Sequence, residues 1–294
     1  MANWLNLTEK EQSNLFNQVS VQTGLPPFAI EKDAWVTLVL RIIFNSKLDS
    51  HIVFKGGTSL SKCYNLIERF SEDIDFSIDR KYLGFNGDLT KGEIRKLRRR
   101  SHEFTVEELP ELLKKNLIEY GIDSKHYTIE VPNTEISDQD PELLLFNYNS
   151  VFKEETYLAS RIQIEIGARS LIEPFEKKDI NSIIDSIYID QNFTEEKFEV
   201  SAVIPAKTLI EKLILLHEEF KKNETKAKHQ RMSRHLYDIA KLMDSKYFEK
   251  AKNDIELFNS ICEHRSKFTP LKPLGTIDYS KLAFHNLEII PPNN

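Results

Sequence analysis

Residues 54–76 carry the side chains that phosphate and metal chemistry requires. The segment Phe54-Lys55-Gly56-Gly57-Thr58-Ser59 is a glycine turn that ends in two hydroxyl side chains. After thirteen further residues come Asp73 and Asp75, whose carboxylates leave the same face of a β-strand because side chains alternate along it. Carboxylate oxygens are the ligands that Mg²⁺ prefers. This stretch therefore predicts one site for a nucleoside triphosphate and the divalent cations needed to attack it.

The reaction that such a site serves is nucleotidyl transfer. Two Mg²⁺ ions about 3.5 to 4 Å apart can bind the attacking and the leaving oxygen together. We expect Asp73 and Asp75 to bridge these ions, and Glu165 is the candidate third carboxylate. Glu165 would fix one metal and accept the proton of the acceptor hydroxyl. Each residue alone also fits a solvated strand face, and their order along the chain favours the shared site.

The glycine turn is expected to hold the triphosphate. Backbone N–H groups at Gly56 and Gly57 would bind the β- and γ-phosphates at the start of a helix, because glycine lets the backbone approach phosphate closely. The hydroxyl of Thr58 or Ser59 would add a hydrogen bond. A Gly-Gly-Thr turn that binds no phosphate is the alternative.

The hydrophobic pattern predicts the elements that position these residues. Thr8 and Glu11 have the spacing of a helix-capping box. Glu165 and Gln163 share the strand face opposite a row of isoleucines. In the first half of the chain and around Glu165, the expected elements are helices over 8–22, 29–45 and 59–68 and strands at 51–54, 73–78 and 161–166.

The remaining pattern divides the chain into two parts. A helical insertion with a basic opening is expected at about 91–121, followed by a strand at 127–131. After Pro205 the pattern becomes helical, with helices expected over 206–220, 231–245 and 248–262 and an extended, proline-containing C-terminal segment. This predicts an α+β fold. The predicted domains are a mixed sheet with flanking helices over 1–204 and a helical domain with an extended tail over 205–294.

Composition excludes several classes of protein. With 40% apolar and 29% charged residues, the chain is predicted to be globular. The net charge of −6 argues against a uniformly basic nucleic-acid coat but leaves local basic patches open. Cys63 and Cys262 have no metal-ligand spacing and are expected to be buried free thiols. No signal peptide or membrane span is evident, so we expect a cytoplasmic protein that does not contact membranes.

Several of these segments together resemble the AbiEii/AbiGii toxin family of the DNA polymerase β nucleotidyltransferase superfamily. The resemblance rests on the glycine turn continued to Lys62, on residues 69–75, and on the upstream segment Glu31-Lys32-Asp33-Ala34-Trp35-Val36. It extends to Lys207 after Pro205-Ala206 and to Arg234-His235-Leu236-Tyr237-Asp238. Most of the chain is covered, and the motifs are specific in combination.

The resemblance implies a polymerase β-like nucleotidyltransferase core with a helical C-terminal domain. It also implies the toxin of a toxin–antitoxin or abortive-infection phage-defence pair, with a cognate antitoxin as partner. Such a toxin would use Mg²⁺ to transfer NMP from an NTP to an RNA acceptor, for which tRNA is the expectation, and so block translation. Some relatives are described as binding GTP.

The resemblance adds catalytic roles for Lys207 and Asp238 and nucleotide binding by Lys55, Lys207 and Arg234. From the residues themselves, Lys207 opens a helix and would reach the triphosphate as a counter-charge. Arg234 and Asp238 are four apart on a helix, and a surface ion pair is the alternative.

Two basic segments bear on the acceptor. Residues 91–100 contain six cations against one acid, and residues 221–231 contain five cations. Both would attract an RNA backbone, although a solvated helix face or a surface for an acidic antitoxin fits as well. Two other functions stay open: a nucleotide-binding module that acts through a partner without transfer, and a nucleotidyltransferase that modifies a protein or a small molecule.

Overall fold

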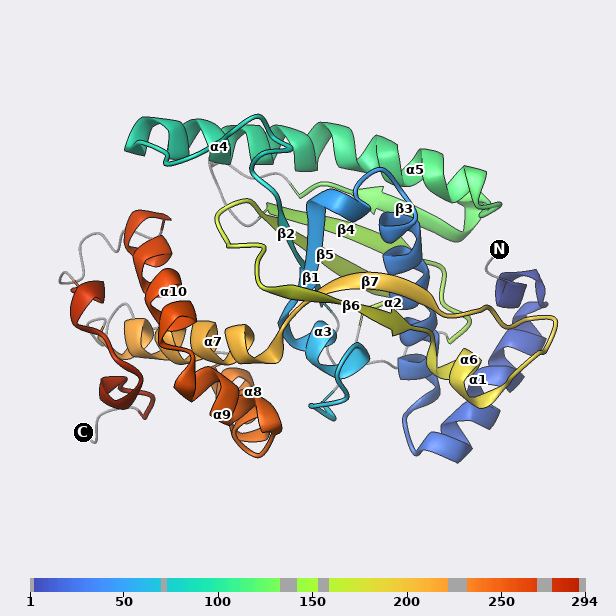
Figure 1. Ribbon diagram of the computed structural model, residues 1–294. Coiled ribbons are helices and arrows are strands. Elements are labelled where there is room, and N and C mark those ends of the chain that lie inside the picture. The colour runs from blue at the N-terminus through green and yellow to red at the C-terminus, as the bar shows by residue number, and fades with distance from the viewer. Residues whose placement is uncertain are drawn as a thin grey trace.

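The computed structural model describes residues 3–69, 73–132, 142–152, 159–221, 232–268 and 277–290. A mixed seven-stranded sheet forms its centre, with helices around it and a group of helices at one end (Figure 1). This confirms the predicted α+β class. The strands are β1 (Ile52–Lys55), β2 (Asp73–Ile78), β3 (Tyr127–Glu130), β4 (Glu142–Tyr148), β5 (Arg161–Gly167), β6 (Phe175–Ile180) and β7 (Phe198–Val203).

The sheet order is β3-β4-β5-β2-β1-β7-β6. β1 pairs antiparallel with β2 and parallel with β7, and β2 pairs parallel with β5. The three strands that carry the glycine turn, the aspartates and Glu165 are therefore neighbours at the middle of the sheet. Strands β4, β6 and β7 were not predicted from the sequence.

The helices are α1 (Glu9–Thr23), α2 (Pro27–Phe44), α3 (Gly56–Lys62), α4 (Lys91–Glu103), α5 (Leu109–Glu119), α6 (Ile183–Ile187), α7 (Pro205–Phe220), α8 (Met232–Met243), α9 (Lys246–Asn253) and α10 (Ile255–Phe268). The predicted capping box between Thr8 and Glu11 starts α1. α2 is buried on nearly every face and packs against β5 and β7.

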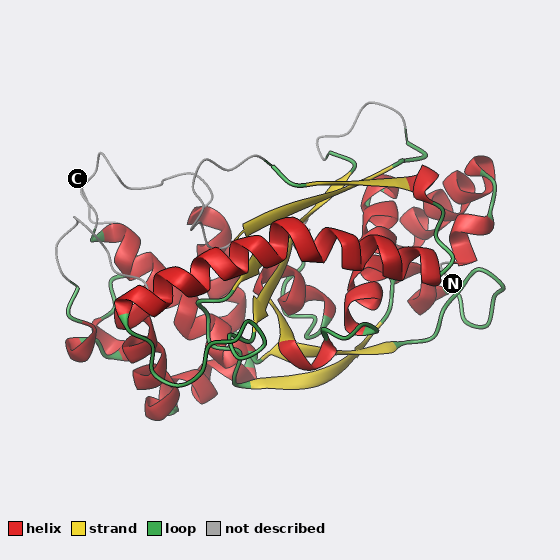
Figure 2. Cartoon of the chain, turned by 90° about the horizontal axis from the view of Figure 1, so that it is seen from above, coloured by secondary structure: helices red, strands yellow, loops and turns green. Residues whose placement is uncertain are grey.

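The insertion is helical, as expected. A second capping box, Thr90 with Glu93, starts α4, and a π-helical turn at Phe104–Glu108 joins α4 to α5. The joined helices form one long rod that runs across the molecule (Figure 2). Arg98 of α4 donates to the carbonyl oxygen of Phe268 in α10 at 3.3 Å. The insertion therefore touches the C-terminal helices.

Three expected elements differ in the structure. The helix expected over 59–68 begins at Gly56 and ends at Lys62. The two glycines therefore belong to the first turn of the helix and do not form a separate turn before it. The single helix expected over 248–262 is two helices, α9 and α10, that meet at Asp254. In the C-terminal segment, residues 277–290 contain two short 3₁₀ turns, at Tyr279–Lys281 and Phe284–Asn286.

Two apolar clusters hold the described residues together. The larger one joins the sheet to α1, α2 and the insertion, with Trp35 at its centre. The smaller one joins the four helices α7, α8, α9 and α10, and it includes Leu60 and Ile67 from the segment around α3. The domain boundary expected at 204/205 falls between β7 and α7 and stays a prediction. Both cysteines are free; Cys262 is buried and Cys63 partly so.

Some predicted features lie outside the described residues. They are the basic connector from 222 to 231 and residues 70–72 of the segment before the aspartates. Within the described part of the chain, no helix is both long and apolar enough to cross a membrane.

Candidate active site

Three adjacent strands place Lys55, Asp75 and Glu165 in one row. Lys55 of β1 lies opposite Asp75 of β2, and Asp75 lies beside Glu165 of β5. Residues paired in this way lie on the same face of a sheet, about 5 Å apart. Asp73 occupies the same face of β2, two residues before Asp75. The structure therefore brings the three predicted carboxylates together at the middle of the sheet.

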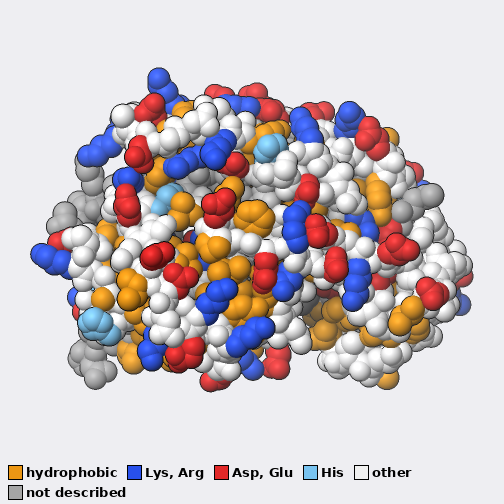
Figure 3. Space-filling model, in the orientation of Figure 1, with side chains coloured by type: hydrophobic (Ala, Val, Ile, Leu, Met, Phe, Trp, Pro, Cys, Tyr) orange, Lys and Arg blue, Asp and Glu red, His pale blue; other side chains and the backbone are white. Residues whose placement is uncertain are grey.

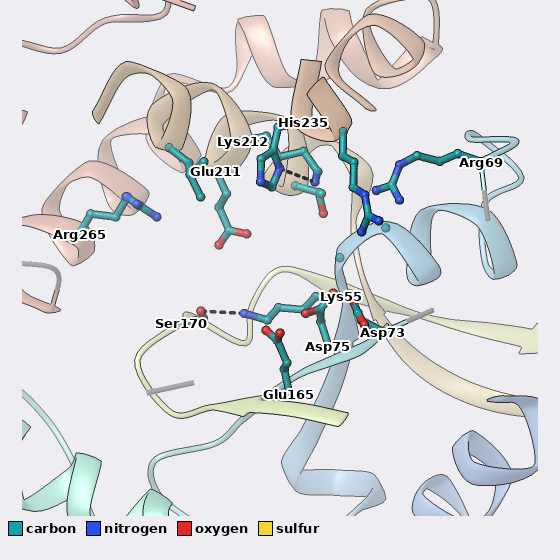
Figure 4. Close-up of a pocket in the computed structure, with 15 residues that line it drawn as sticks. Lys55, Arg69, Asp73, Asp75, Glu165, Ser170, Glu211, Lys212, His235 and Arg265 are labelled. Carbon is teal, nitrogen blue, oxygen red and sulfur yellow. Dashed lines mark hydrogen bonds between the residues drawn. The ribbon is translucent and has the colours of Figure 1, made fainter. Parts of the chain in front are cut away.

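This row forms the floor of a cavity of about 400 Å³, the central pocket. Its walls come from the start of α3 and from the C-terminal helices (Figure 4). The lining residues are Lys55, Gly56, Gly57, Arg69, Asp73, Asp75, Glu165, Ser170, Thr208, Glu211, Lys212, Leu215, Arg234, His235 and Arg265. The carboxylates thus face a cationic wall that contains Arg69, Lys212, Arg234 and Arg265.

One face of α7 supplies much of that wall. Thr208, Glu211, Lys212 and Leu215 all line the pocket, and their spacing of three and four residues puts them on one side of a helix. In Figure 4, Glu211 points into the cavity toward the carboxylates, and Lys212 lies beside His235 on the opposite side of the cavity. α7 therefore contributes both a cation and an acid to the site.

Lys207 does not reach this pocket. Its side chain is 1% exposed, and its ammonium donates to the carbonyl oxygen of Leu171. Burial lowers its pKa, which the nearby Glu211 opposes. The expected contact between Lys207 and the triphosphate is therefore not supported. Lys212, which lies further along α7, occupies the pocket instead.

The start of α3 is shaped around Asp75. Gly56 has a φ of +76°, and a Cβ added there would collide with Asp75 Oδ2. Glycine is therefore required by both the backbone conformation and the carboxylate. Gly56 and Gly57 line the pocket, and their contact with phosphate stays a prediction.

The two hydroxyl residues are placed differently from the expectation. Thr58 is buried and donates its hydroxyl to the backbone oxygen of Asp73, and Ser59 is also buried. Neither lines the central pocket. Both residues fall in the first turn of α3, which begins at Gly56. Thr58 thus ties α3 to β2.

Asp238 is the anchor behind the cationic wall. Its side chain is 0% exposed, and it accepts two hydrogen bonds from Arg69, at 2.7 and 2.8 Å. Lys212 Nζ lies 3.0 Å from its second oxygen. Burial alone would raise the pKa of Asp238, but the bonds from Arg69 and Lys212 outweigh it and lower the pKa. Asp238 therefore positions two pocket cations, and a surface ion pair with Arg234 is not its role.

Two further contacts, one made by Lys55 and one by Lys212, complete the polar network of the pocket. Lys55 Nζ donates to Ser170 Oγ at 3.1 Å. Lys212 Nζ lies 3.4 Å from His235 Nδ1, and both contacts are drawn in Figure 4. Burial and the neighbouring Lys212 lower the pKa of His235 to about 4. His235 is therefore neutral at pH 7.

Crowding perturbs the carboxylates on the floor. Burial raises the pKa of Asp75, and Lys55 and Lys212 oppose that shift. Burial, together with the charges of Asp75 and Asp73, raises the pKa of Glu165 to about 7. Adjacent acids with raised pKa values share protons in the absence of a cation.

The donor set fits Mg²⁺ in its chemistry. The carboxylates of Asp73, Asp75 and Glu165 are hard oxygen ligands, and a divalent cation would relieve the repulsion that raises the pKa of Glu165. Among the described residues, however, no group of three or more metal-ligating side chains is arranged around one point. The fit is thus one of chemistry and charge, without a ready-made three-ligand centre.

Replacing Glu165 by Gln should stabilise the metal-free protein at high pH. The folded pKa of Glu165 is about 7, against an ordinary value of 4.5. Its ionisation therefore leaves the free energy of unfolding unchanged below pH 4.5 and lowers it most above pH 7. We expect Glu165→Gln to raise the free energy of unfolding by about 1–2 kcal/mol at pH 8, allowing for solvent screening. The gain should shrink toward pH 5. Urea titrations in EDTA at both pH values measure it.

Glu130→Gln is the matched control, because Glu130 is an exposed carboxylate on β3 of the same sheet. It should change stability little at either pH. An equal effect of Glu165→Gln at pH 5 and pH 8 would contradict the shifted pKa.

Several pocket residues had no role in the sequence analysis: Arg69, Ser170, Glu211, Lys212 and Arg265. The spacing of Lys212 from Thr208 and Leu215 was a usable signal, since it marks one helix face. Arg265 comes from α10 and is paired with Glu218 at 2.5 Å. No local pattern connects it to a glycine turn some two hundred residues earlier in the chain.

Comparisons with known proteins bear on the family and the fold. The family described as "Nucleotidyl transferase AbiEii toxin, Type IV TA system" matches residues 38–290. The structure of MenT4, nucleotidyltransferase toxin Rv2826c from Mycobacterium tuberculosis H37Rv, is similar with a TM-score of 0.50 and 18% identity, over 96% of this chain and 80% of that chain. JHP933 from Helicobacter pylori has a TM-score of 0.41 and 16% identity, over 83% of this chain and 78% of that chain. No curated protein matches the chain.

The likeness to MenT4 supports the fold, and the family match covers most of the chain. This chain belongs to the AbiEii family of nucleotidyltransferase toxins of type IV toxin–antitoxin systems.

Proposed function

We propose that this toxin transfers NMP from an NTP to an RNA acceptor, with tRNA as the expected acceptor, and so blocks translation. The observation that carries the proposal is the row of Lys55, Asp75 and Glu165 facing the cationic wall of the central pocket. Cations opposite carboxylates suit a triphosphate held beside a divalent metal. An antitoxin partner, a phage-defence role and a cytoplasmic location follow from the same proposal.

The chain's own residues would divide the work as follows. Gly56 and Gly57 would donate backbone N–H groups to phosphate, and Lys212, Arg69 and Arg234 would neutralise its charge. Asp73, Asp75 and Glu165 would hold Mg²⁺, which would stabilise charge on the reacting oxygens. Glu165 would accept the proton of the acceptor hydroxyl. The hydroxyl oxygen would at the same time bond to the α-phosphorus, and pyrophosphate would leave.

An RNA acceptor is supported by α4. Lys91, Arg95, Lys96 and Arg99 are exposed on this helix, whereas Arg100 is paired with Glu108. On the face shown in Figure 3, basic and acidic side chains are interspersed. Attraction of an RNA backbone would therefore be local to such segments and sensitive to salt.

The test is label transfer from each NTP in turn, labelled at the α-phosphate, with Mg²⁺ and total tRNA. Label should enter RNA from at least one NTP and should need the divalent cation. Label that enters a protein or a small molecule would overturn the RNA acceptor. No transfer to any acceptor, with NTP binding intact, would instead favour a binding module that acts through a partner.

A further inference from the structure

A second cavity, the side pocket, lies beside α3 against α2 and α6. Its volume is about 500 Å³, within the range of small-molecule sites. In Figure 1, α3 lies between the C-terminal helices and the pair α2 and α6. Arg69 lines both the central pocket and the side pocket. The two cavities are therefore neighbours.

The floor of the side pocket is a buried ion pair. Lys62 Nζ lies 2.5 Å from Asp33 Oδ1, and both side chains are about one-tenth exposed. Asp33 Oδ2 accepts a hydrogen bond of 2.8 Å from the backbone N–H of Ile183. The contacts join α2, α3 and α6. They also give a location to the segment Glu31–Val36, which resembled the family but had no assigned role.

The lining differs in chemistry from that of the central pocket. Its charges balance, with Lys62 and Arg69 against Asp33 and Glu68. The rest combines apolar side chains with amides and hydroxyls, among them Val36, Ile67, Ile183, Asn65, Asn181 and Ser182. A lining in which a few apolar side chains stand among amides, hydroxyls and balanced charges suits an uncharged ligand with both apolar and hydrogen-bonding surface. A nucleoside has this chemistry, whereas a triphosphate does not.

We infer that the side pocket holds the nucleoside of the RNA acceptor that carries the attacking hydroxyl. This inference rests on the proposed transfer to RNA. Thr58 lines the side pocket and donates to the backbone oxygen of Asp73, so the wall of this pocket is fixed to the strand that carries the aspartates. A nucleoside there would share Arg69 with a triphosphate in the central pocket.

Ser186→Trp tests the inference by filling the mouth of the side pocket. Ser186 lines it, is exposed, and donates its hydroxyl to the carbonyl oxygen of Ile183. Ser266→Trp is the matched control, because Ser266 is an exposed helical serine that donates to the carbonyl oxygen of Glu263. Equilibrium binding of total tRNA and of NTP to the full chain is measured at elevated salt, which weakens backbone attraction.

Ser186→Trp should weaken tRNA binding by about tenfold or more and leave NTP binding unchanged, while Ser266→Trp changes neither. Free nucleosides should compete with tRNA on the wild type. Unchanged tRNA binding by Ser186→Trp, equal loss of NTP binding, or no tRNA binding by the wild type overturns the inference. Pocket-dependent tRNA binding without label transfer would overturn the proposed transfer and leave the side pocket as an RNA site.

Discussion

Asp75→Asn should lower label transfer by about a thousandfold or more, since removing a metal ligand forfeits several kcal/mol of transition-state stabilisation. Asp75 stands between Lys55 and Glu165 in the row that forms the pocket floor. Burial raises the pKa of this carboxyl, so the negative charge of Asp75 destabilises the metal-free fold. The variant should therefore stay folded while it loses activity. Initial rates with saturating NTP and tRNA measure the loss.

Asp179→Asn is the control for this variant. Asp179 is an exposed carboxylate on β6 of the same sheet and does not line the central pocket. It should transfer label at the wild-type rate. Transfer by Asp75→Asn within about tenfold of wild type would remove Asp75 from the metal site.

The sequence was sufficient to predict which side chains share a face of each strand, but not which strands lie next to each other in the sheet. Alternation along β2 and β5 put Asp73, Asp75 and Glu165 on polar faces, because one face of each strand had to be buried. That Asp75 and Glu165 stand side by side depends on the parallel pairing of β2 with β5. Such pairing joins segments far apart in the chain, and no local pattern specifies it.

The choice between two lysines on α7 shows a second limit. The helix was predicted correctly, but Lys207 and Lys212 lie on different sides of it. Lys207 is covered by the segment that contains Leu171, and Lys212 turns toward Asp238. Only the packing of α7 against its neighbours decides which lysine enters the pocket. The same applies to Thr58, whose hydroxyl binds the backbone of Asp73.

Asp238→Asn should destabilise the protein by about 3 kcal/mol at pH 7, because it leaves two cations without their buried counter-charge. The carboxylate is fully buried and bonded to Arg69 and Lys212. Its pKa lies below the ordinary value of 3.8, so its contribution is present above that pH and is lost as pH falls through the folded pKa. Urea titrations at pH 7 and below pH 4 should show a difference that shrinks in acid.

Asp244→Asn is the control, since Asp244 is exposed just after α8, and it should change stability little. If the loss in Asp238→Asn comes from uncompensated charge, the double variant Arg69→Met, Asp238→Asn should recover part of it. No recovery would assign the loss to packing around Asp238. Because Arg69 and Lys212 line the central pocket, Asp238→Asn should also weaken NTP binding. Stability and nucleotide affinity therefore depend on the same carboxylate, which joins α7, α8 and the segment after α3.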